Sequence, residues 1–241
     1  MTAVGALPVF FGRNVSTKAS DTLLGFAAGV MLAASFFSLI LPGVEAATSL
    51  YGSRVVAAGA CALGVVFGVG LMEIINERVP HEHFSQGKQG PDTERLTRIW
   101  LFVLAITLHN APEGLAVGVG FGSGDFASGL TLAIGIGLQN APEGLAVALG
   151  LLSIGYAPGR AFLIAALTGA VEPVAGAAGA YAVSLSHEVL PWALTMAAGA
   201  MLYVISHEII PDTHQHGNER EATMGLTAGL VVMMFLDVAF G

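Results

Sequence analysis

Charged side chains are scarce in this sequence. Asp, Glu, Lys and Arg together make up 11% of its 241 residues, whereas 54% of the residues are hydrophobic. A soluble domain carries about 25% charged residues, so these charges are too few to cover the surface of a water-soluble globule of this length. The alternative is a soluble protein with an unusually large core, and the lengths of the apolar runs exclude it.

Long, predominantly apolar runs take up most of the chain. Because a spanning helix needs about 20 predominantly apolar residues and backbone groups in lipid must be hydrogen-bonded internally, we expect each run to form a transmembrane helix. The pattern does not alternate with period two, which argues against a membrane β-barrel. The predicted fold is an all-α, polytopic bundle in one domain (1–241), with seven full helices at 22–41, 55–72, 99–124, 126–156, 161–185, 189–206 and 222–241.

Basic residues are rarer still, and their distribution predicts an orientation. Of the nine Lys and Arg, the odd-numbered loops hold eight and the even-numbered loops hold only Arg54. By the positive-inside rule the odd loops, including the long loop at about 76–98, face the cytoplasm. The C-terminus then faces outward.

Two further scarcities limit the interpretation. The single cysteine, Cys61, cannot form an internal disulfide. The apolar stretch 1–12 is too short to span a membrane and lacks the basic residues that begin a signal peptide. We interpret this stretch as the remnant of an eighth helix, with an interfacial segment as the alternative.

Two near-identical segments lie in neighbouring predicted helices. Residues 109–120 read HNAPEGLAVGVG and residues 139–150 read QNAPEGLAVALG, which agree at nine of twelve positions. Only one short loop separates the helices, so they run antiparallel and the repeat is inverted with respect to the membrane. Inverted repeats with interrupted helices near the bilayer midplane are typical of secondary transporters.

Each copy of the repeat carries side chains suited to a metal ion. A polar residue precedes a glutamate by four positions, which stacks the two on one helix face, and an asparagine lies beside them. Imidazole, carboxylate and amide oxygen are ligands for a borderline cation such as Zn²⁺. The candidates are His109, Asn110 and Glu113 in the first copy and Gln139, Asn140 and Glu143 in the second.

A third acid, Glu172, lies within the predicted helix at 161–185 and precedes a proline. A charge at the centre of a membrane helix costs about 2.5–3.5 kcal/mol, so three unpaired acids would cost on the order of 8–10 kcal/mol. The predicted spans contain no Lys or Arg to compensate them. A bound cation or protonation of the carboxylates remains.

With these motifs, the sequence resembles the ZIP (Zrt/Irt-like) family of divalent metal transporters, in particular its bacterial GufA-type branch. The resemblance covers residues 21–241. It rests most specifically on HNAPEG at 109–114, QNAPEG at 139–144, Glu172-Pro173, SHEIIP at 206–211 and LGFAAGVML at 24–32.

The resemblance implies an elevator-type carrier with a binuclear site, in which Glu113 and Glu143 bridge two metals. Met31, His109 and Gln139 would complete the first metal position, and Asn110, Asn140 and Glu172 the second. A cytoplasmic exit site is implied at His81, His83, His207 and Glu208. Asp237, in the last predicted helix, is a candidate entrance acid.

The expected substrate is Zn²⁺ moving toward the cytoplasm, with Cd²⁺, Fe²⁺ and Mn²⁺ as alternatives, and the expected location is the bacterial inner membrane. We expect metal ions and the lipid bilayer as partners, expect no nucleic acid, and leave a homodimer open. An exporter that uses the same site is an alternative. An intramembrane metalloprotease would need a His-Glu-x-x-His motif, which the sequence lacks, so we expect no enzyme.

Overall fold

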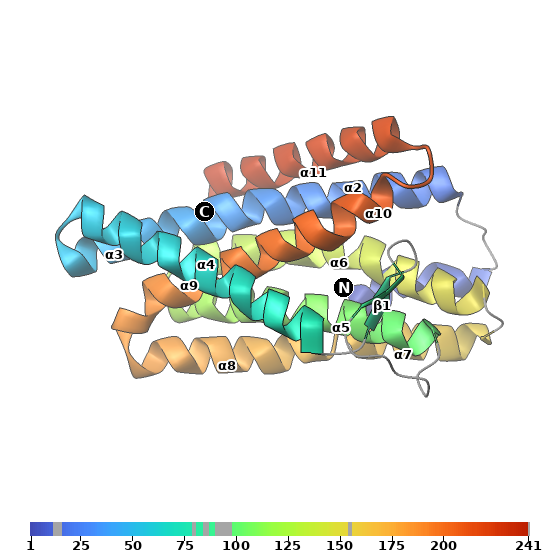
Figure 1. Ribbon diagram of the computed structural model, residues 1–241, viewed down its shortest axis with the longest axis horizontal. Helices are drawn as coiled ribbons and strands as arrows, with labels where there is room; N and C mark the ends of the chain where they lie inside the picture. The colour runs from blue at the N-terminus through green and yellow to red at the C-terminus, as the bar shows by residue number, and fades with distance from the viewer. Residues whose placement is uncertain (12–15, 79–80, 84–86, 90–97, 154–155, 241) are drawn as a thin grey trace.

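The computed structural model describes residues 1–11, 16–78, 81–83, 87–89, 98–153 and 156–240, without the side chains of residues 81–83, 87–89, 98–102, 105, 109, 153 and 187. Long helices lie side by side in a bundle (Figure 1). In these ranges the elements are α1 (Thr2–Ala6), η1 (Leu7–Phe11), α2 (Thr17–Ala34), η2 (Ser35–Ile40), α3 (Leu41–Tyr51), α4 (Arg54–Arg78), β1 (His81–His83), β2 (Gly87–Gln89), α5 (Arg98–Gly122), α6 (Phe126–Ser153), α7 (Pro158–Thr168), α8 (Val171–Leu185), η3 (His187–Val189), α9 (Leu190–Val204), η4 (Ile205–Ile209), α10 (Ile210–Thr213) and α11 (Glu219–Phe240).

The helices confirm the predicted membrane bundle. In the part of the chain described, six stretches are long and apolar enough to cross a membrane, and the 25-residue helix α5 runs beside them. Helices α2, α5, α7 and α11 begin at one end of the bundle, and α4, α6 and α9 begin at the other (Figure 1). The six stretches are Thr17–Tyr51, Arg54–Arg78, Phe126–Leu152, Pro158–Leu185, Leu190–Thr213 and Glu219–Phe240.

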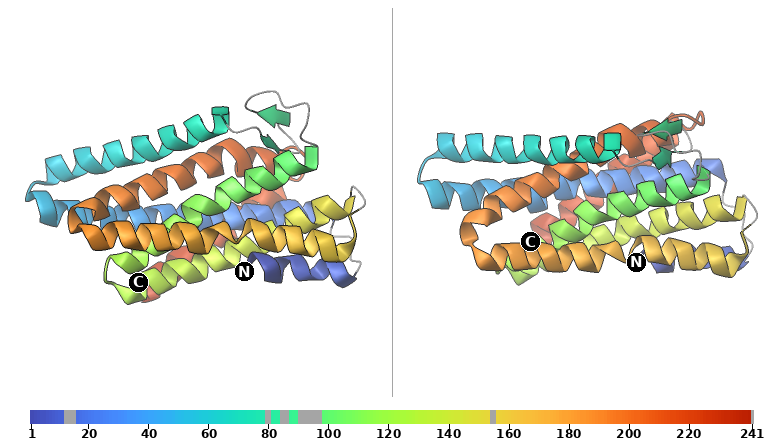
Figure 2. Two further views of the ribbon diagram at one scale, coloured as in Figure 1. Left: turned by 90° about the horizontal axis from the view of Figure 1, so that it is seen from below. Right: turned by 60° about the horizontal axis from the view of Figure 1, so that its bottom comes forward.

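The N-terminal stretch forms the short apolar helix Thr2–Phe11, which is not among the stretches long enough to cross a membrane. It packs against α6 and α7, and the N-terminus lies about half-way along the bundle (Figure 2). The long polar segment at 76–98 is not wholly irregular, because α4 continues to Arg78 and an antiparallel pair, β1 and β2, follows.

The predicted helix at 161–185 is interrupted in the structure. Helix α7 ends at Thr168 and α8 begins at Val171. Pro173 is tolerated near the start of α8 because the first N–H groups of a helix have no partner within it. Glu172 therefore lies in the first turn of α8, where the helix dipole favours a negative charge.

A second internal repeat relates α2–η2–α3 to α9–η4–α10. The sequence Ala-Ala-Gly-x-Met-Leu occurs at 27–32 and at 197–202, and a π-helix begins three residues after each copy, at Ser35 and Ile205. The two segments run in opposite directions through the bundle (Figure 1). Short π-helices are rare and often mark functional sites, and our sequence analysis missed both this repeat and its π-helices.

Glycines bring four pairs of the described helices into backbone contact: α1 with α6, α2 with α11, α4 with α9, and α5 with α8. A Cβ on Gly29 of α2 would lie 2.0 Å from the carbonyl oxygen of Leu226 on α11. A Cβ on Gly118 of α5 would lie 1.9 Å from the carbonyl oxygen of Gly176 on α8, and Gly68 brings α4 equally close to α9. Small residues allow such close approach in membrane helices.

Candidate metal centre

Helices α5 and α6 bring the two copies of the HNAPEG/QNAPEG repeat together inside the bundle. Asn110, Glu113 and Gln139 are 0% exposed, Asn140 is 1% exposed and Glu143 is 2% exposed. The side-chain nitrogen Nε2 of Gln139 donates a hydrogen bond of 2.6 Å to Oε1 of Glu113. The two copies are thus joined directly, across antiparallel helices.

Several polar atoms of this cluster have no hydrogen-bond partner within the described part of the chain. They include both amide atoms of Asn110, Oε2 of Glu113 and both carboxylate oxygens of Glu143. Each unsatisfied buried group costs about 1–3 kcal/mol, and charged groups cost more. Residues 99–159 contain no Lys or Arg, so a cation from outside the chain, or protons, would have to balance the carboxylates.

Glu172 lies close to this cluster. Its carboxylate is near enough to Glu113 and Glu143 for electrostatic repulsion among the three acids. Glu172 and Asn140 line a cavity of about 640 Å³ whose walls are otherwise mostly glycine and alanine. The hydroxyl of Thr2 donates a hydrogen bond of 3.3 Å to Oε1 of Glu172, a contact that sequence reasoning did not anticipate.

The structure says less about Met31 and His109, two other predicted ligands of the first metal position. Met31 is 0% exposed on α2, which packs against α6. Position 109 belongs to α5, but the side chain of His109 lies outside the described part. Among the side chains described, no group of three or more His, Cys, Asp or Glu is arranged to hold a metal ion. His109, the amides and the thioether lie outside that statement, so the complete ligand set stays a prediction.

Of the four predicted exit residues, the structure describes the side chains of His207 and Glu208 but not those of His81 and His83. His207 and Glu208 lie in the π-helix η4, and Glu208 is only 4% exposed. Nε2 of His207 lies 3.4 Å from Nδ2 of Asn76, and its ring stacks on Tyr203 with centroids 4.9 Å apart. His81 and His83 belong to β1, and their side chains lie outside the described part.

A pairing at the opposite π-helix also escaped sequence reasoning. The hydroxyl of Ser38 in η2 donates a hydrogen bond of 2.6 Å to Oδ1 of Asp237 on α11. In the second repeat, position 38 corresponds to position 208, because the two copies are offset by 170 residues. Recognition of the Ala-Ala-Gly-x-Met-Leu repeat would have directed attention to Ser38.

Comparison with known proteins gives one consistent result. Residues 76–237 match the family described as ZIP zinc transporter. The whole chain is 50% identical to zinc transporter ZIPB of Bordetella bronchiseptica, covering 78% of that protein, and 45% identical to zinc transporter GufA of Myxococcus xanthus, covering 94% of it. It is also 37% identical to human zinc transporter ZIP11, again over 94% of that protein. On this evidence the chain belongs to the ZIP family of zinc transporters.

Proposed function

We propose that this protein carries Zn²⁺ across the bacterial inner membrane toward the cytoplasm. The observation that carries the proposal is the buried, mutually repelling set of carboxylates in the two joined copies of the repeat. Glu113 and Glu143 are almost fully buried, and no Lys or Arg is present on either helix between residues 99 and 159. A divalent cation supplies the compensating charge, and zinc is the substrate in the names of the relatives.

The proposed site holds two metal ions. Glu113 and Glu143 bridge them, because each carboxylate has oxygens without a hydrogen bond in the described part of the chain. The first ion takes Met31, His109 and Gln139, a set with one soft thioether, one imidazole and one amide oxygen. The second ion takes Asn110, Asn140 and Glu172, which supply oxygen ligands.

The Gln139 amide can donate a hydrogen bond to Glu113 and still offer an oxygen to the first metal ion. The amide nitrogen of Gln139 now donates to Glu113, whereas a metal ion needs the amide oxygen, because the amide NH₂ donates hydrogen bonds and coordinates no cation. Oε1 of Gln139 has no hydrogen-bond partner in the described part of the chain, so it is available to Zn²⁺ while Nε2 keeps its hydrogen bond to Glu113.

Movement of the site between the two membrane faces would be an elevator-type displacement. The glycine contacts that bring backbones closest join α1 to α6, α2 to α11, α4 to α9, and α5 to α8. These pairs support a division into a moving group of α1 and α5–α8, which carries most of the ligands, and a static group of α2–α4 and α9–α11. Between the groups lie side-chain contacts such as Met233 of α11 in the space beside Gly135 of α6.

Release would occur at the end of the bundle where α4 ends and α5 and α11 begin. His207 and Glu208 lie on that side, with His81 and His83 in the nearby strand β1. The basic loops of the sequence identify this end as cytoplasmic by the positive-inside rule.

Equilibrium zinc binding to the purified protein tests the site. We expect the double variant Glu113→Ala, Glu143→Ala to lose the buried ions, whereas the exposed acid of Glu188→Ala serves as a matched control and leaves binding unchanged. If the double variant keeps the zinc stoichiometry of the original protein, the proposed site is wrong.

A further inference from the structure

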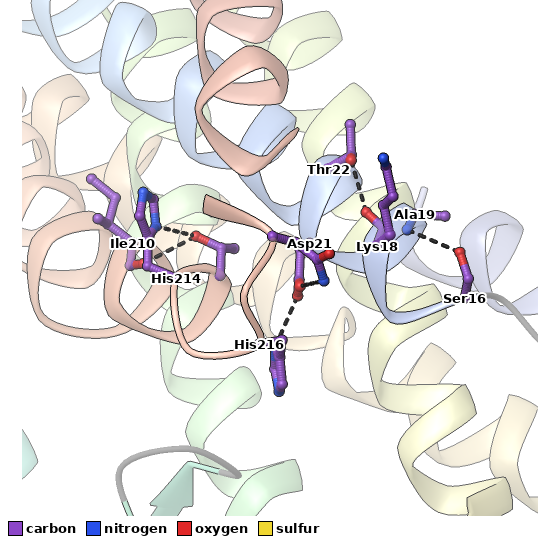
Figure 3. Close-up of polar contacts among 10 residues, drawn as sticks. Ser16, Lys18, Ala19, Asp21, Thr22, Ile210, His214 and His216 are labelled. Carbon is purple, nitrogen blue, oxygen red and sulfur yellow. Dashed lines mark hydrogen bonds and ion pairs between the residues drawn. The ribbon is translucent and has the colours of Figure 1, made fainter. Parts of the chain in front are cut away.

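A carboxylate–histidine pair joins the start of α2 to the loop between α10 and α11 (Figure 3). Nδ1 of His216 lies 3.1 Å from Oδ1 of Asp21. Nδ2 of Asn218 donates a hydrogen bond of 2.8 Å to Oδ2 of the same carboxylate. Asp21 belongs to the second turn of α2, and its two partners belong to the loop between α10 and α11. Both carboxylate oxygens of Asp21 therefore contact side chains of this loop.

The two side chains of the pair differ sharply in exposure. The side chain of Asp21 is 3% exposed, whereas that of His216 is 44% exposed. Lys18, one turn before Asp21, pairs instead with Glu221 at 2.5 Å. Within the described residues neither Lys nor Arg forms an ion pair with Asp21, so its buried negative charge acts on the imidazole of His216.

The Asp21 carboxylate determines which ring nitrogen of His216 carries the hydrogen and which one presents its lone pair to solvent. An ionised carboxylate only accepts hydrogen bonds, so Nδ1 carries the hydrogen in the neutral ring. Nε2 is then unprotonated, and the ring projects away from Asp21 (Figure 3). A histidine that donates one ring N–H to a carboxylate and presents the other nitrogen is the usual arrangement of a metal-bound histidine, because the carboxylate fixes the ring and raises its basicity.

We propose that Nε2 of His216 binds Zn²⁺ at this end of the bundle, with Asp21 as its positioning residue. A borderline divalent cation suits a neutral imidazole, and water completes the coordination. One protein ligand gives weak, rapidly reversible binding, which suits an ion on its way out. That role as an acceptor of released substrate rests on the proposed transport function, whereas binding at His216 does not.

His214, two residues earlier, provides a matched comparison. Its Nδ1 lies 2.9 Å from the backbone carbonyl oxygen of Ile210 and 3.1 Å from the hydroxyl of Thr213. Its ring nitrogen is thus also engaged, but by neutral groups on its own helix rather than by a carboxylate. If the buried charge of Asp21 matters, His216 binds the metal more tightly than His214 does.

The test is nitrogen NMR of the full chain, labelled at histidine and held in lipid nanodiscs, during titration with ZnCl₂. His216→Gln and His214→Gln assign the two signals. We expect Zn²⁺ to shift Nε2 of His216 while Nδ1 keeps its hydrogen. Asp21→Asn should weaken this response by about 10–100-fold, the usual loss when the carboxylate behind a ligating histidine is removed.

Two results would overturn the proposal. One is no shift of the His216 signal even when zinc is raised far above the concentration that saturates the buried site. The other is an equal response in Asp21→Asn, which would mean that Asp21 only fastens the loop. The same titration on Glu113→Ala, Glu143→Ala separates the two hypotheses, because loss of the buried site leaves the His216 response intact if the present proposal is right.

Discussion

Gln139 and Glu113 are hydrogen-bonded to each other, although they lie on two helices that run in opposite directions. Nε2 of Gln139 is 2.6 Å from Oε1 of Glu113, and both side chains are fully buried. Position 139 is also one of the three positions at which the second copy of the repeat differs from the first, which has His109 there. The asymmetry of the repeat thus supplies a hydrogen-bond donor to the first glutamate.

Replacement of this donor should destabilise the metal-free protein. Gln139→Ala leaves the buried Glu113 carboxylate without the only donor that the described structure gives it, and we expect a loss of about 1–3 kcal/mol. Thermal unfolding with and without zinc measures it. Leu138→Ala is the control, because Leu138 is 38% exposed and should have a smaller effect. Equal loss in both variants would contradict the assigned role.

We expect the close contact between α5 and α8 to leave no room for a side chain at position 118. A Cβ at position 118 would meet the backbone of Gly176, whereas a Cβ at Gly59 would have nothing within 4 Å. We expect Gly118→Ala to lower stability by about 1–3 kcal/mol, as overpacked sites do, and to impair transport, whereas Gly59→Ala changes neither. Unfolding midpoints and zinc flux of the two variants, measured side by side, decide this.

The thioether of Met31 should affect the choice of metal. Met31→Leu keeps the side-chain volume, so the fold should change little, but it removes a soft ligand. We expect Cd²⁺ to compete less well against Zn²⁺ by on the order of tenfold, or about 1.4 kcal/mol, because thioethers prefer softer ions. Competition binding measures the ratio. An unchanged ratio would remove Met31 from the ligand set.

Orientation in the membrane can be tested with single cysteines. In a Cys61→Ala background, Glu188→Cys and Gln215→Cys place exposed thiols at opposite ends of the bundle. We expect an impermeant maleimide to label position 188 in intact cells and position 215 only after permeabilisation. The reverse pattern would invert the proposed topology and place the C-terminus inside.

The membrane bundle could be predicted because lipid leaves few alternatives. The apolar run at 126–156, for example, corresponds to α6 (Phe126–Ser153), whose start is fixed by Asp125 accepting the backbone N–H groups of Ala127 and Ser128. The two glutamates of the repeat were identified because buried acids are too costly to occur without a role.

Other features could not be read from the sequence. The break between α7 and α8 at Gly169 leaves the hydrophobicity of the run unchanged, so the run predicted one helix. A π-helix alters only the spacing of a single turn, which is why η2 and η4 were missed. Asp21 and His216 are 195 residues apart, and only the packing of α2 beside the α10–α11 loop brings them together.

Zinc uptake into proteoliposomes tests the central claim most directly. Vesicles that contain the protein and a trapped zinc indicator receive external Zn²⁺, and the initial rate is compared with that of Glu143→Ala and of Glu188→Ala. We predict saturable uptake by the original protein and Glu188→Ala, and uptake at the level of empty vesicles for Glu143→Ala. Uptake that is absent from the original protein, or that survives unchanged in Glu143→Ala, would contradict transport through this site.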